Sequence, residues 1–405
     1  MKYWKKLSQA TIQETIFTAL HENINYLESP FLGIPASHLD EKVFNQDASF
    51  LKDAPFMSTM IKNPNHIGCH TMGDSESFFS GTHQLERDVI DICACDILEG
   101  NRDEVDGYVA SGGTEANLQA VWVYRNYFQQ EEKVEVNQIA ILCSEDTHYS
   151  ADKAGNVFGL KVLKVPVHKM TRAIQKEELK AVVSKAKNDG NTCFIVLSNM
   201  MTTMFGSIDD VNLYAEVLKE VGVSFKIHID GAFGGFYYPF TDEKKELTFK
   251  NPNISSFTLD AHKMAQAPYG TGIFLIRKGY LEYANTKEAS YVEGEDCTLI
   301  GSRSGANAVA IWMILSKHGP HGWSEKIFIL QKRTSWMCDR LDEKGLLYFR
   351  DPLSNIITID ASSVKTEVAK EFGLVPDSHA NPSWYKIVVM EHVTIEKLEA
   401  LNEKL

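Results

Sequence analysis

Long apolar runs, disulfide patterns and low-complexity tracts are all missing from this sequence. No stretch approaches the roughly 18 consecutive apolar residues of a membrane-spanning helix, so we expect no membrane span. The start is basic and then polar and lacks the apolar core of a secretory signal. The use of cysteine predicts a cytoplasmic protein. The seven cysteines are an odd number and thinly spread, as expected of reduced thiols rather than a disulfide framework.

An excess of positive charge is missing as well. The 405 residues include 41 Lys+Arg and 54 Asp+Glu, which gives a formal net charge of −13. This balance disfavours nucleic acid or an anionic membrane as the main partner. With 44% hydrophobic residues the chain can bury a large core, so wholesale disorder is excluded. A chain of this length is expected to divide into a large domain and a smaller one.

Short apolar runs alternate with helical stretches through the middle of the chain. Two of the runs, 139–142 and 194–197, are apolar at every position, as strands covered on both faces of a parallel sheet are. The pattern predicts an α/β fold with a mainly parallel central sheet. The expected strands are 138–143, 162–167, 193–198, 223–230, 255–259 and 272–276, and the expected helices between them are 115–128, 176–188 and 211–221.

The two ends of the chain have a different pattern of apolar and polar residues. Residues 1–45 read as a helical arm and loop, because apolar residues at helical spacing are followed by a Pro- and Gly-containing break. We therefore expect an arm over 1–45, a large domain over 46–300 and a small α+β domain over 301–405. In the last of these, the expected helices are 306–317, 322–341 and 394–405, and the expected strands are 347–349, 355–359 and 384–390.

Ligands of open α/β sheets bind at the carboxyl ends of the strands, so the residues that follow each apolar run are the candidates for chemistry. These positions carry a carboxylate, a lysine, imidazoles and hydroxyls. In addition, Ser111-Gly112-Gly113-Thr114 opens the helix expected from residue 115. The other candidates are Thr147, His148 and Tyr149, then Thr202 and Thr203, then Asp230, and finally Asp260, His262 and Lys263.

Each of these features has an ordinary structural explanation when it is taken alone. A Ser-Gly-Gly-Thr turn is most often a plain helix cap, and a lysine at a sheet edge is most often solvated. Together, however, the residues match the needs of pyridoxal phosphate. Lys263 offers an amine, Asp230 a fixed negative charge for the pyridine nitrogen, and the 111–114 turn a phosphate seat at a helix N-terminus. His148 offers a flat group for the ring.

From about residue 65 to its end the chain resembles the group II pyridoxal-phosphate-dependent amino-acid decarboxylases, which have the aspartate-aminotransferase fold (fold type I). It is most similar to the tyrosine/aspartate decarboxylases, with some similarity to the bacterial histidine decarboxylases. The order and spacing of the motifs in this chain are specific to that group. The motifs lie at 107–117, 146–150, 228–236, 260–264, 301–306 and 386–393.

The resemblance implies a role for each candidate around the cofactor. Lys263 would form the internal aldimine and Asp230 would pair with the pyridine nitrogen. His148 and Ala232 would lie on opposite faces of the ring, with Thr203 beside it. The phosphate would be held by three residues of this subunit and reached by one from the partner of a homodimer with shared active sites. The three are Gly113, Thr114 and His262, and the fourth is Ser302.

The implied reaction is decarboxylation of an L-amino acid to its amine and carbon dioxide, through an external aldimine and a quinonoid. The candidate substrate is tyrosine, aspartate or another small or aromatic amino acid. Tyr291, on the expected mobile loop, would protonate the substrate Cα. Two positions depart from the pattern: Met201 stands where relatives have Gly, and Lys386 where they have Arg. Because lysine lacks the bidentate fork of arginine, the second change weakens the case for an acidic substrate.

Three alternatives follow from the same residues. A carbon–carbon lyase resembling the sphingosine-phosphate lyases would keep the cofactor and break a different bond. A non-catalytic binding protein on the same fold is disfavoured. Such a protein would be expected to have lost at least one of Lys263, Asp230 and His148, and all three are present. Finally, no metal site is expected: Cys93 and Cys95 point to different helix faces, and His66 and His70 are better explained as structural or pocket-lining residues.

Overall fold

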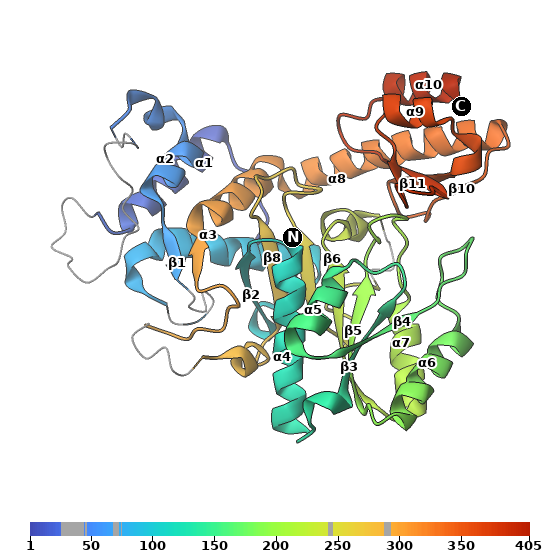
Figure 1. The fold of residues 1–405 in the computed structure, drawn as a ribbon. Coiled ribbons are helices and arrows are strands. Elements are labelled where there is room, and N and C mark those ends of the chain that lie inside the picture. The colour runs from blue at the N-terminus through green and yellow to red at the C-terminus, as the bar shows by residue number, and fades with distance from the viewer. Residues whose placement is uncertain (26–43, 45–46, 68–72, 74, 242–245, 287–292) are drawn as a thin grey trace. The chain divides into compact units, whose positions relative to one another are not determined.

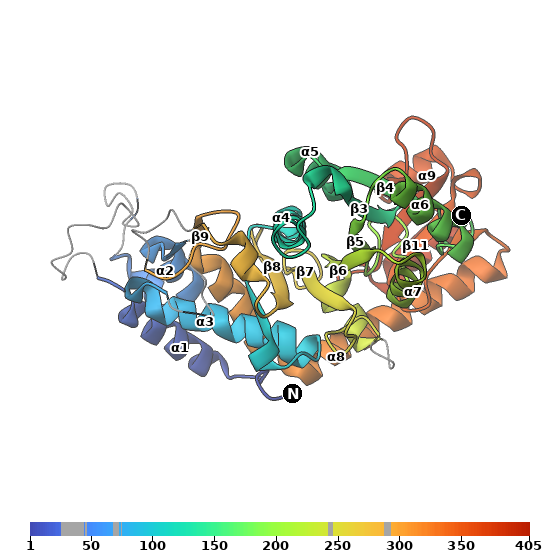
Figure 2. The ribbon, with the colours of Figure 1, turned by 90° about the horizontal axis from the view of Figure 1, so that it is seen from below.

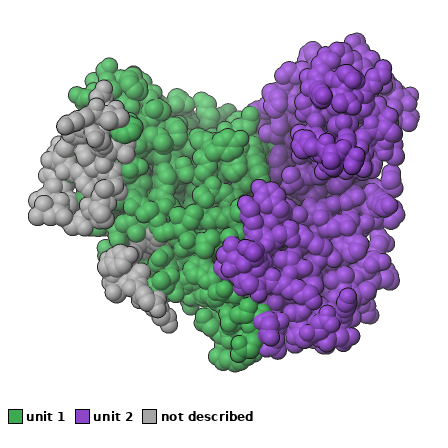
Figure 3. Space-filling model, in the orientation of Figure 1, with its two compact units in different colours: residues 1–136, 248–321 green, residues 137–247, 322–405 purple. Residues whose placement is uncertain are grey.

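A computed structural model describes residues 1–25, 44, 47–67, 73, 75–241, 246–286 and 293–405. The chain forms two compact units, each built from two segments, and Figure 3 shows them in different colours. Unit 1 comprises residues 1–136 and 248–321, and unit 2 comprises residues 137–247 and 322–405. Within the described ranges, no helix combines the length and the apolar character needed to cross a membrane.

Unit 2 contains a parallel α/β layer whose strands lie in the order β6-β5-β3-β4. Every neighbouring pair among these four strands is parallel, and every residue of β3 and β5 is buried. The mainly parallel α/β core predicted from the all-apolar runs is therefore confirmed. Helices α6 and α7 lie beside each other next to the strands (Figure 2). The elements are β3 (Ile139–Ser144), α5 (Ser150–Phe158), β4 (Lys161–Val165), α6 (Lys176–Asn188), β5 (Cys193–Asn199), α7 (Val211–Val221) and β6 (Ser224–Gly231).

The C-terminal part of unit 2 forms a small antiparallel sheet in the order β10-β11-β13-β12. It packs on its own apolar core, which includes Met337, Leu341, Ile357 and Leu398. The expected small α+β region is thus present, with α9 and β12 as elements too short for the sequence pattern to predict. The elements are β10 (Tyr348–Phe349), β11 (Ile356–Asp360), α9 (Thr366–Glu371), β12 (Val375–Pro376), β13 (Trp384–Val388) and α10 (Ile395–Lys404).

Unit 1 contributes three strands in the order β2-β8-β7, in which β8 runs antiparallel to both neighbours. The sequence pattern predicted neither β2 nor the reversed direction of β8. Helix α4 packs against β7 and β8, and helix α1 against α2 and α3 (Figure 1). The elements are α1 (Gln9–Glu22), α2 (Pro55–Lys62), β1 (Asn65–Ile67), α3 (Ser80–Asp91), β2 (Val105–Ala110), α4 (Gly113–Glu131), β7 (Ile254–Asp260), β8 (Gly272–Arg277) and β9 (Ser302–Ser304).

The long helix α8 (Gly305–Glu343) is interrupted where the sequence predicts a gap between two helices. Gly319 has a φ of +62° and is followed by Pro320. A Cβ at Gly319 would lie 2.5 Å from the Cβ of Lys6, so only glycine fits this break. The predicted arm includes the observed helix α1, while residues 26–43 and 45–46 lie outside the described residues. The predicted domain boundaries at 45 and 300 stay predictions.

Candidate active site

In unit 1, a glycine turn joins β2 to the start of α4. Gly112 is extended, and no side chain in the described part of the chain caps the helix. The Glu115 carboxylate instead accepts a hydrogen bond from the Ser111 N–H at 2.7 Å, which fixes the turn. A Cβ on Gly272, at the start of β8, would lie 2.5 Å from the Gly112 Cα, so the two backbones are in direct contact. The N–H groups of Gly113 and Thr114 thus stand at the positive end of a 19-residue helix.

Lys263 and His262 follow the end of β7, as predicted. Lys263 Nζ lies 3.1 Å and His262 Nε2 3.5 Å from one oxygen of Asp260, a carboxylate that is only 3% exposed. His262 Nδ1 is buried and has no hydrogen-bond partner in the described part of the chain. Burial lowers the pKa of His262, with Asp260 acting in the opposite direction. A Cβ on Gly112 would lie 3.8 Å from the His262 ring, so the glycine turn and His262 are close together.

Ser302 is exposed on β9, where it pairs with Ile67 of β1. The next residue, Arg303, is buried and forms an ion pair with the fully buried Glu86. Glu86 also accepts hydrogen bonds from the Val109 N–H at 2.7 Å and from His66 Nδ1 at 2.5 Å. Burial alone would raise the pKa of Glu86, but Arg303 and His66 hold it well below its ordinary value.

In unit 2, Asp230 lies at the end of β6 and is 8% exposed, the crowded position predicted for it. Its Oδ1 accepts a hydrogen bond from the Ala232 N–H at 3.1 Å, which holds Ala232 next to the carboxylate. His228, two residues earlier, is fully buried. Burial lowers the pKa of His228 to about 4, although Asp230 favours its charged form.

His148 lies in the loop between β3 and α5 and is half-buried. Its Nδ1 is 3.0 Å from Ser150 Oγ, and its ring centroid is 4.0 Å from that of Tyr149. Thr203 is exposed in the loop after β5, and its carbonyl accepts a hydrogen bond from Lys386 Nζ at 2.9 Å. The lysine that departs from the family pattern therefore contacts the loop of a predicted cofactor residue.

The predicted site residues divide between the two units. Tyr291 lies outside the described residues, as do Cys69 and His70. Unit 1 contains Gly113, Thr114, His262, Lys263 and Ser302, and unit 2 contains His148, Thr203, Asp230 and Ala232.

Sequence reasoning missed three buried polar residues: Glu86, Asn199 and Asp209. Asn199 is the last residue of β5, directly after the apolar run predicted at 193–198. The rule that polar residues after strands mark a site could therefore have found it. Glu86 lies within an amphipathic helix and Asp209 within a loop, and no local pattern distinguishes either one.

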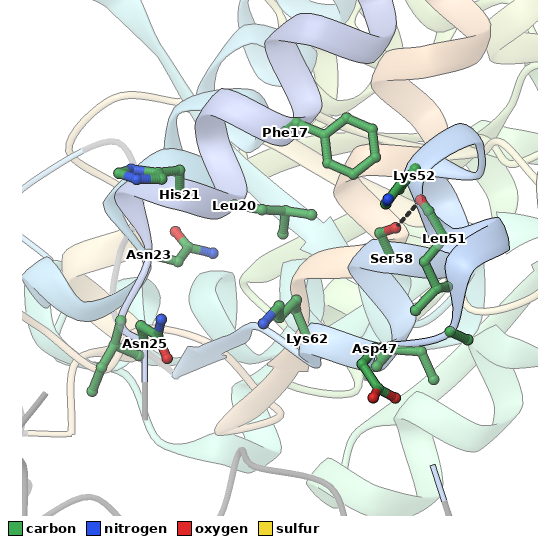
Figure 4. A pocket seen from close by; sticks show the side chains of 13 residues that line it. Phe17, Leu20, His21, Asn23, Asn25, Asp47, Leu51, Lys52, Ser58 and Lys62 are labelled. Atoms are coloured by element: carbon green, nitrogen blue, oxygen red, sulfur yellow. Dashed lines mark hydrogen bonds between the residues drawn. The ribbon is translucent and has the colours of Figure 1, made fainter. Parts of the chain in front are cut away.

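A separate pocket of about 550 Å³ lies between α1, α2 and the turn before α2 (Figure 4). Phe17, Leu20 and Leu51 provide apolar lining, and Lys52 and Lys62 provide charge. None of the described residues predicted to bind the cofactor lines it. This pocket is therefore not the candidate active site.

Comparison with known proteins identifies the family. Residues 85–348 match the pyridoxal-dependent decarboxylase conserved domain. The chain is 50% identical over 403 residues to a tryptophan decarboxylase of Clostridium sporogenes, covering 99% of this chain and 96% of that protein. The chain belongs to the group II pyridoxal-phosphate-dependent decarboxylases.

One further relative has a similar name, and one solved structure has a similar fold. A probable L-tyrosine/L-aspartate decarboxylase of Methanocella arvoryzae is 29% identical over 369 residues, covering 87% of this chain and 94% of that protein. The solved L-methionine decarboxylase of Streptomyces sp. 590 superposes with a TM-score of 0.73 at 21% identity, covering 98% of this chain and 93% of that one. It confirms the predicted fold type I. By its matched domain and its 50% identical relative, this decarboxylase is a pyridoxal-phosphate-dependent carboxy-lyase acting on an amino acid.

The residues present fit the cofactor of the family. His262 Nδ1 is buried and, among the described residues, has no hydrogen-bond partner, and no described side chain caps the nearby start of α4. These groups provide hydrogen-bonding capacity where a phosphate would need it. The Lys263 side chain is 38% exposed, so its amine is open to a carbonyl group. Asp230 is buried and held in place, as a fixed counter-charge must be.

Proposed function

We propose that this decarboxylase acts on aromatic L-amino acids and converts L-tryptophan to tryptamine and carbon dioxide. The observation that carries the proposal is the 50% identity, over 99% of the chain, to a protein named for that activity. The lysine at position 386 supports it, because the weaker carboxylate recognition by lysine disfavours the acidic alternative.

We further propose the following division of work among the residues. Bound pyridoxal phosphate supplies an electron sink that accepts the electron pair left when carbon dioxide departs. Lys263 would supply the amine that attaches the cofactor. Asp230 keeps the proton on the pyridine nitrogen, and Tyr291 donates a proton to the substrate Cα. His148, Ala232 and Thr203 would contact the cofactor ring. Gly113, Thr114 and His262 hold the phosphate.

The charge of Asp230 matters more as the reaction proceeds. Its interaction with the protonated nitrogen strengthens as negative charge develops on the substrate, so it stabilises the transition state more than the bound substrate. We therefore expect Asp230→Asn to lower kcat by far more than it changes KM. Equal effects on kcat and KM would argue against this role.

The direct test offers the cofactor-loaded protein every proteinogenic L-amino acid and identifies the amine products by mass spectrometry. Lys263→Ala is the blank. We expect tryptamine as the main product, absent from the blank. Another amine, such as tyramine or β-alanine, would replace the substrate assignment while keeping the reaction. No amine from any amino acid would contradict the decarboxylase function itself.

We also propose that the protein is a homodimer in which Ser302 reaches the phosphate bound by the partner subunit. The molar mass from light scattering tests the dimer. Mixing inactive Lys263→Ala subunits with subunits carrying a disruptive Ser302→Trp change tests the sharing. Hybrid dimers should regain activity in one of their two sites, because that site has both a native Lys263 and a native partner Ser302. No recovery in verified hybrids would contradict a shared site.

A further inference from the structure

A buried amide–carboxyl pair lies behind the residues of unit 2 that are proposed to hold the cofactor. The backbone N–H and the side-chain Nδ2 of Asn199 both donate to Asp209 Oδ2, at 2.8 and 2.7 Å. In return, the Asp209 N–H donates to the Asn199 carbonyl at 3.0 Å. Asn199 is 3% exposed and Asp209 7%, so water does not replace these bonds easily.

The same amide reaches the loop that carries His148. Asn199 Nδ2 also donates to Thr147 Oγ1 at 2.8 Å and to Ser144 Oγ at 3.1 Å. The two hydroxyls are 3.2 Å apart and are both buried. Thr147 directly precedes His148, so the Asn199 amide is bonded to the residue next to His148.

The pair also contacts the segments that carry two more of these residues, Thr203 and Asp230. Asn199 and Asp209 close the base of the loop that carries Thr203, and this loop is tightened by a bridge between Met200 and Ile208. On the other side, Asn199 pairs in register with Asp230, whose carbonyl accepts the Met200 N–H at 2.9 Å. One side-chain pair therefore contacts elements carrying three separate cofactor residues.

We propose that Asn199 and Asp209 are positioning residues that fix His148, Thr203 and Asp230 relative to one another for cofactor binding. Asn199 supplies the hydrogen-bond donors, and Asp209 supplies the acceptor that orients the Asn199 amide. The two hydrogens of the amide serve three acceptors, so the arrangement depends on Asp209 keeping the amide in one orientation. The proposal concerns hydrogen-bond geometry and needs no negative charge on Asp209.

The test titrates the cofactor-free protein with pyridoxal phosphate and records the visible circular dichroism of the bound cofactor. Asn199→Ala is compared with Asn191→Ala. Asn191 is also buried and donates through Nδ2 to a backbone carbonyl at 3.0 Å, but it precedes β5 instead of ending it. Far-ultraviolet circular dichroism and the melting temperature of the cofactor-free variants show whether they are folded.

We expect Asn199→Ala to weaken cofactor binding by about tenfold or more and to change the dichroism, because a buried network loses its central donor. Asn191→Ala should keep a cofactor affinity within about twofold of the native value, even if it lowers the stability by a similar amount. Among the described residues, Asn191 shares no hydrogen-bond partner with Asn199, so its loss should not be coupled to cofactor binding. Native affinity and dichroism in folded Asn199→Ala would overturn the proposal.

Substitutions at Asp209 test it independently if Asn199→Ala fails to fold. Asp209→Asn keeps an acceptor oxygen and should bind the cofactor within about threefold of the native protein, whereas Asp209→Ala should resemble Asn199→Ala. An equal loss of cofactor affinity in Asp209→Asn and Asp209→Ala would show that the charge of Asp209 matters and not its acceptor geometry, and it would overturn the proposal. The proposal rests on the assigned roles of His148, Thr203 and Asp230. His148→Ala in the same titration separates an error in that assignment from an error in the positioning role, and no substrate is involved.

Discussion

Replacing Glu86 by glutamine is expected to destabilise unit 1 strongly. The carboxylate is fully buried and accepts hydrogen bonds from Arg303, His66 and the Val109 N–H. Glutamine keeps the shape and one acceptor oxygen but removes the negative charge, and its NH2 group faces groups that donate. Arg303, whose side chain is 5% exposed, then loses its buried counter-charge.

The magnitude follows from this burial. Removing one partner of a buried ion pair typically costs about 3–5 kcal/mol, because the other charge stays desolvated. Since the pKa of Glu86 is held below its ordinary value of 4.5, its contribution to stability is full above that pH and declines as the pH falls toward the lowered value. The difference in free energy of unfolding between the native protein and Glu86→Gln should therefore become smaller at acidic pH.

Guanidinium unfolding of the cofactor-free protein, followed at pH 7.5 and at about pH 4, measures both effects. Glu220→Gln is the control, because Glu220 also binds two cations, Lys176 and Lys180, but on the exposed surface. Its unfolding midpoint should not change measurably. A loss below about 1 kcal/mol for Glu86→Gln at pH 7.5 would refute the reasoning, since it would mean that Arg303 does not need this charge.

Three further outcomes are expected. Burial raises the pKa of Asp209 to about 7, so the folded state keeps a proton that the unfolded chain releases, and the native protein loses stability as the pH rises toward 7. The melting temperature of Asp209→Asn relative to the native protein should therefore be higher at pH 8 than at pH 5; the same difference at both would contradict the shift. Met201 has a φ of +73°, so Met201→Gly should be more stable than Met201→Ala by about 1 kcal/mol in denaturant unfolding, the reverse of the usual order. Gly206 and Gly222 both have positive φ, but a Cβ on Gly206 would lie 2.3 Å from the Ser354 Oγ, whereas one on Gly222 would meet nothing closer than 3.7 Å. Gly206→Ala should therefore cost about 2–4 kcal/mol and Gly222→Ala about 1, and equal costs would show that the Ser354 contact yields without strain.

The elements that the sequence predicted well are those with a strong local signal. Strands β3 and β5 are apolar at nearly every position, and helices α6 and α7 have clear helical periodicity, so their bounds agree closely with the prediction. Strand β2 was missed because Asp106 and Gly107 interrupt its apolar pattern. The reversed direction of β8 was missed because strand direction depends on which partners the strand finds, and the strand's own residues do not record it.

The sequence by itself determined the family, the cofactor and the order of the site residues along the chain. Lys263, Asp230 and His148 lie at or shortly after the ends of apolar runs, and that local pattern is enough to place them at strand ends, whereas the 111–114 turn was recognised as the start of a helix. The tertiary structure alone showed what holds them. Glu86 meets Arg303 across 217 positions of sequence, and Asn199 meets Thr147 across 52. These partners come from separate elements, and a hydrogen bond between distant residues leaves no periodicity in either segment. The physical reason is that buried polar groups choose partners by proximity in the folded chain, which only the packing of the elements decides.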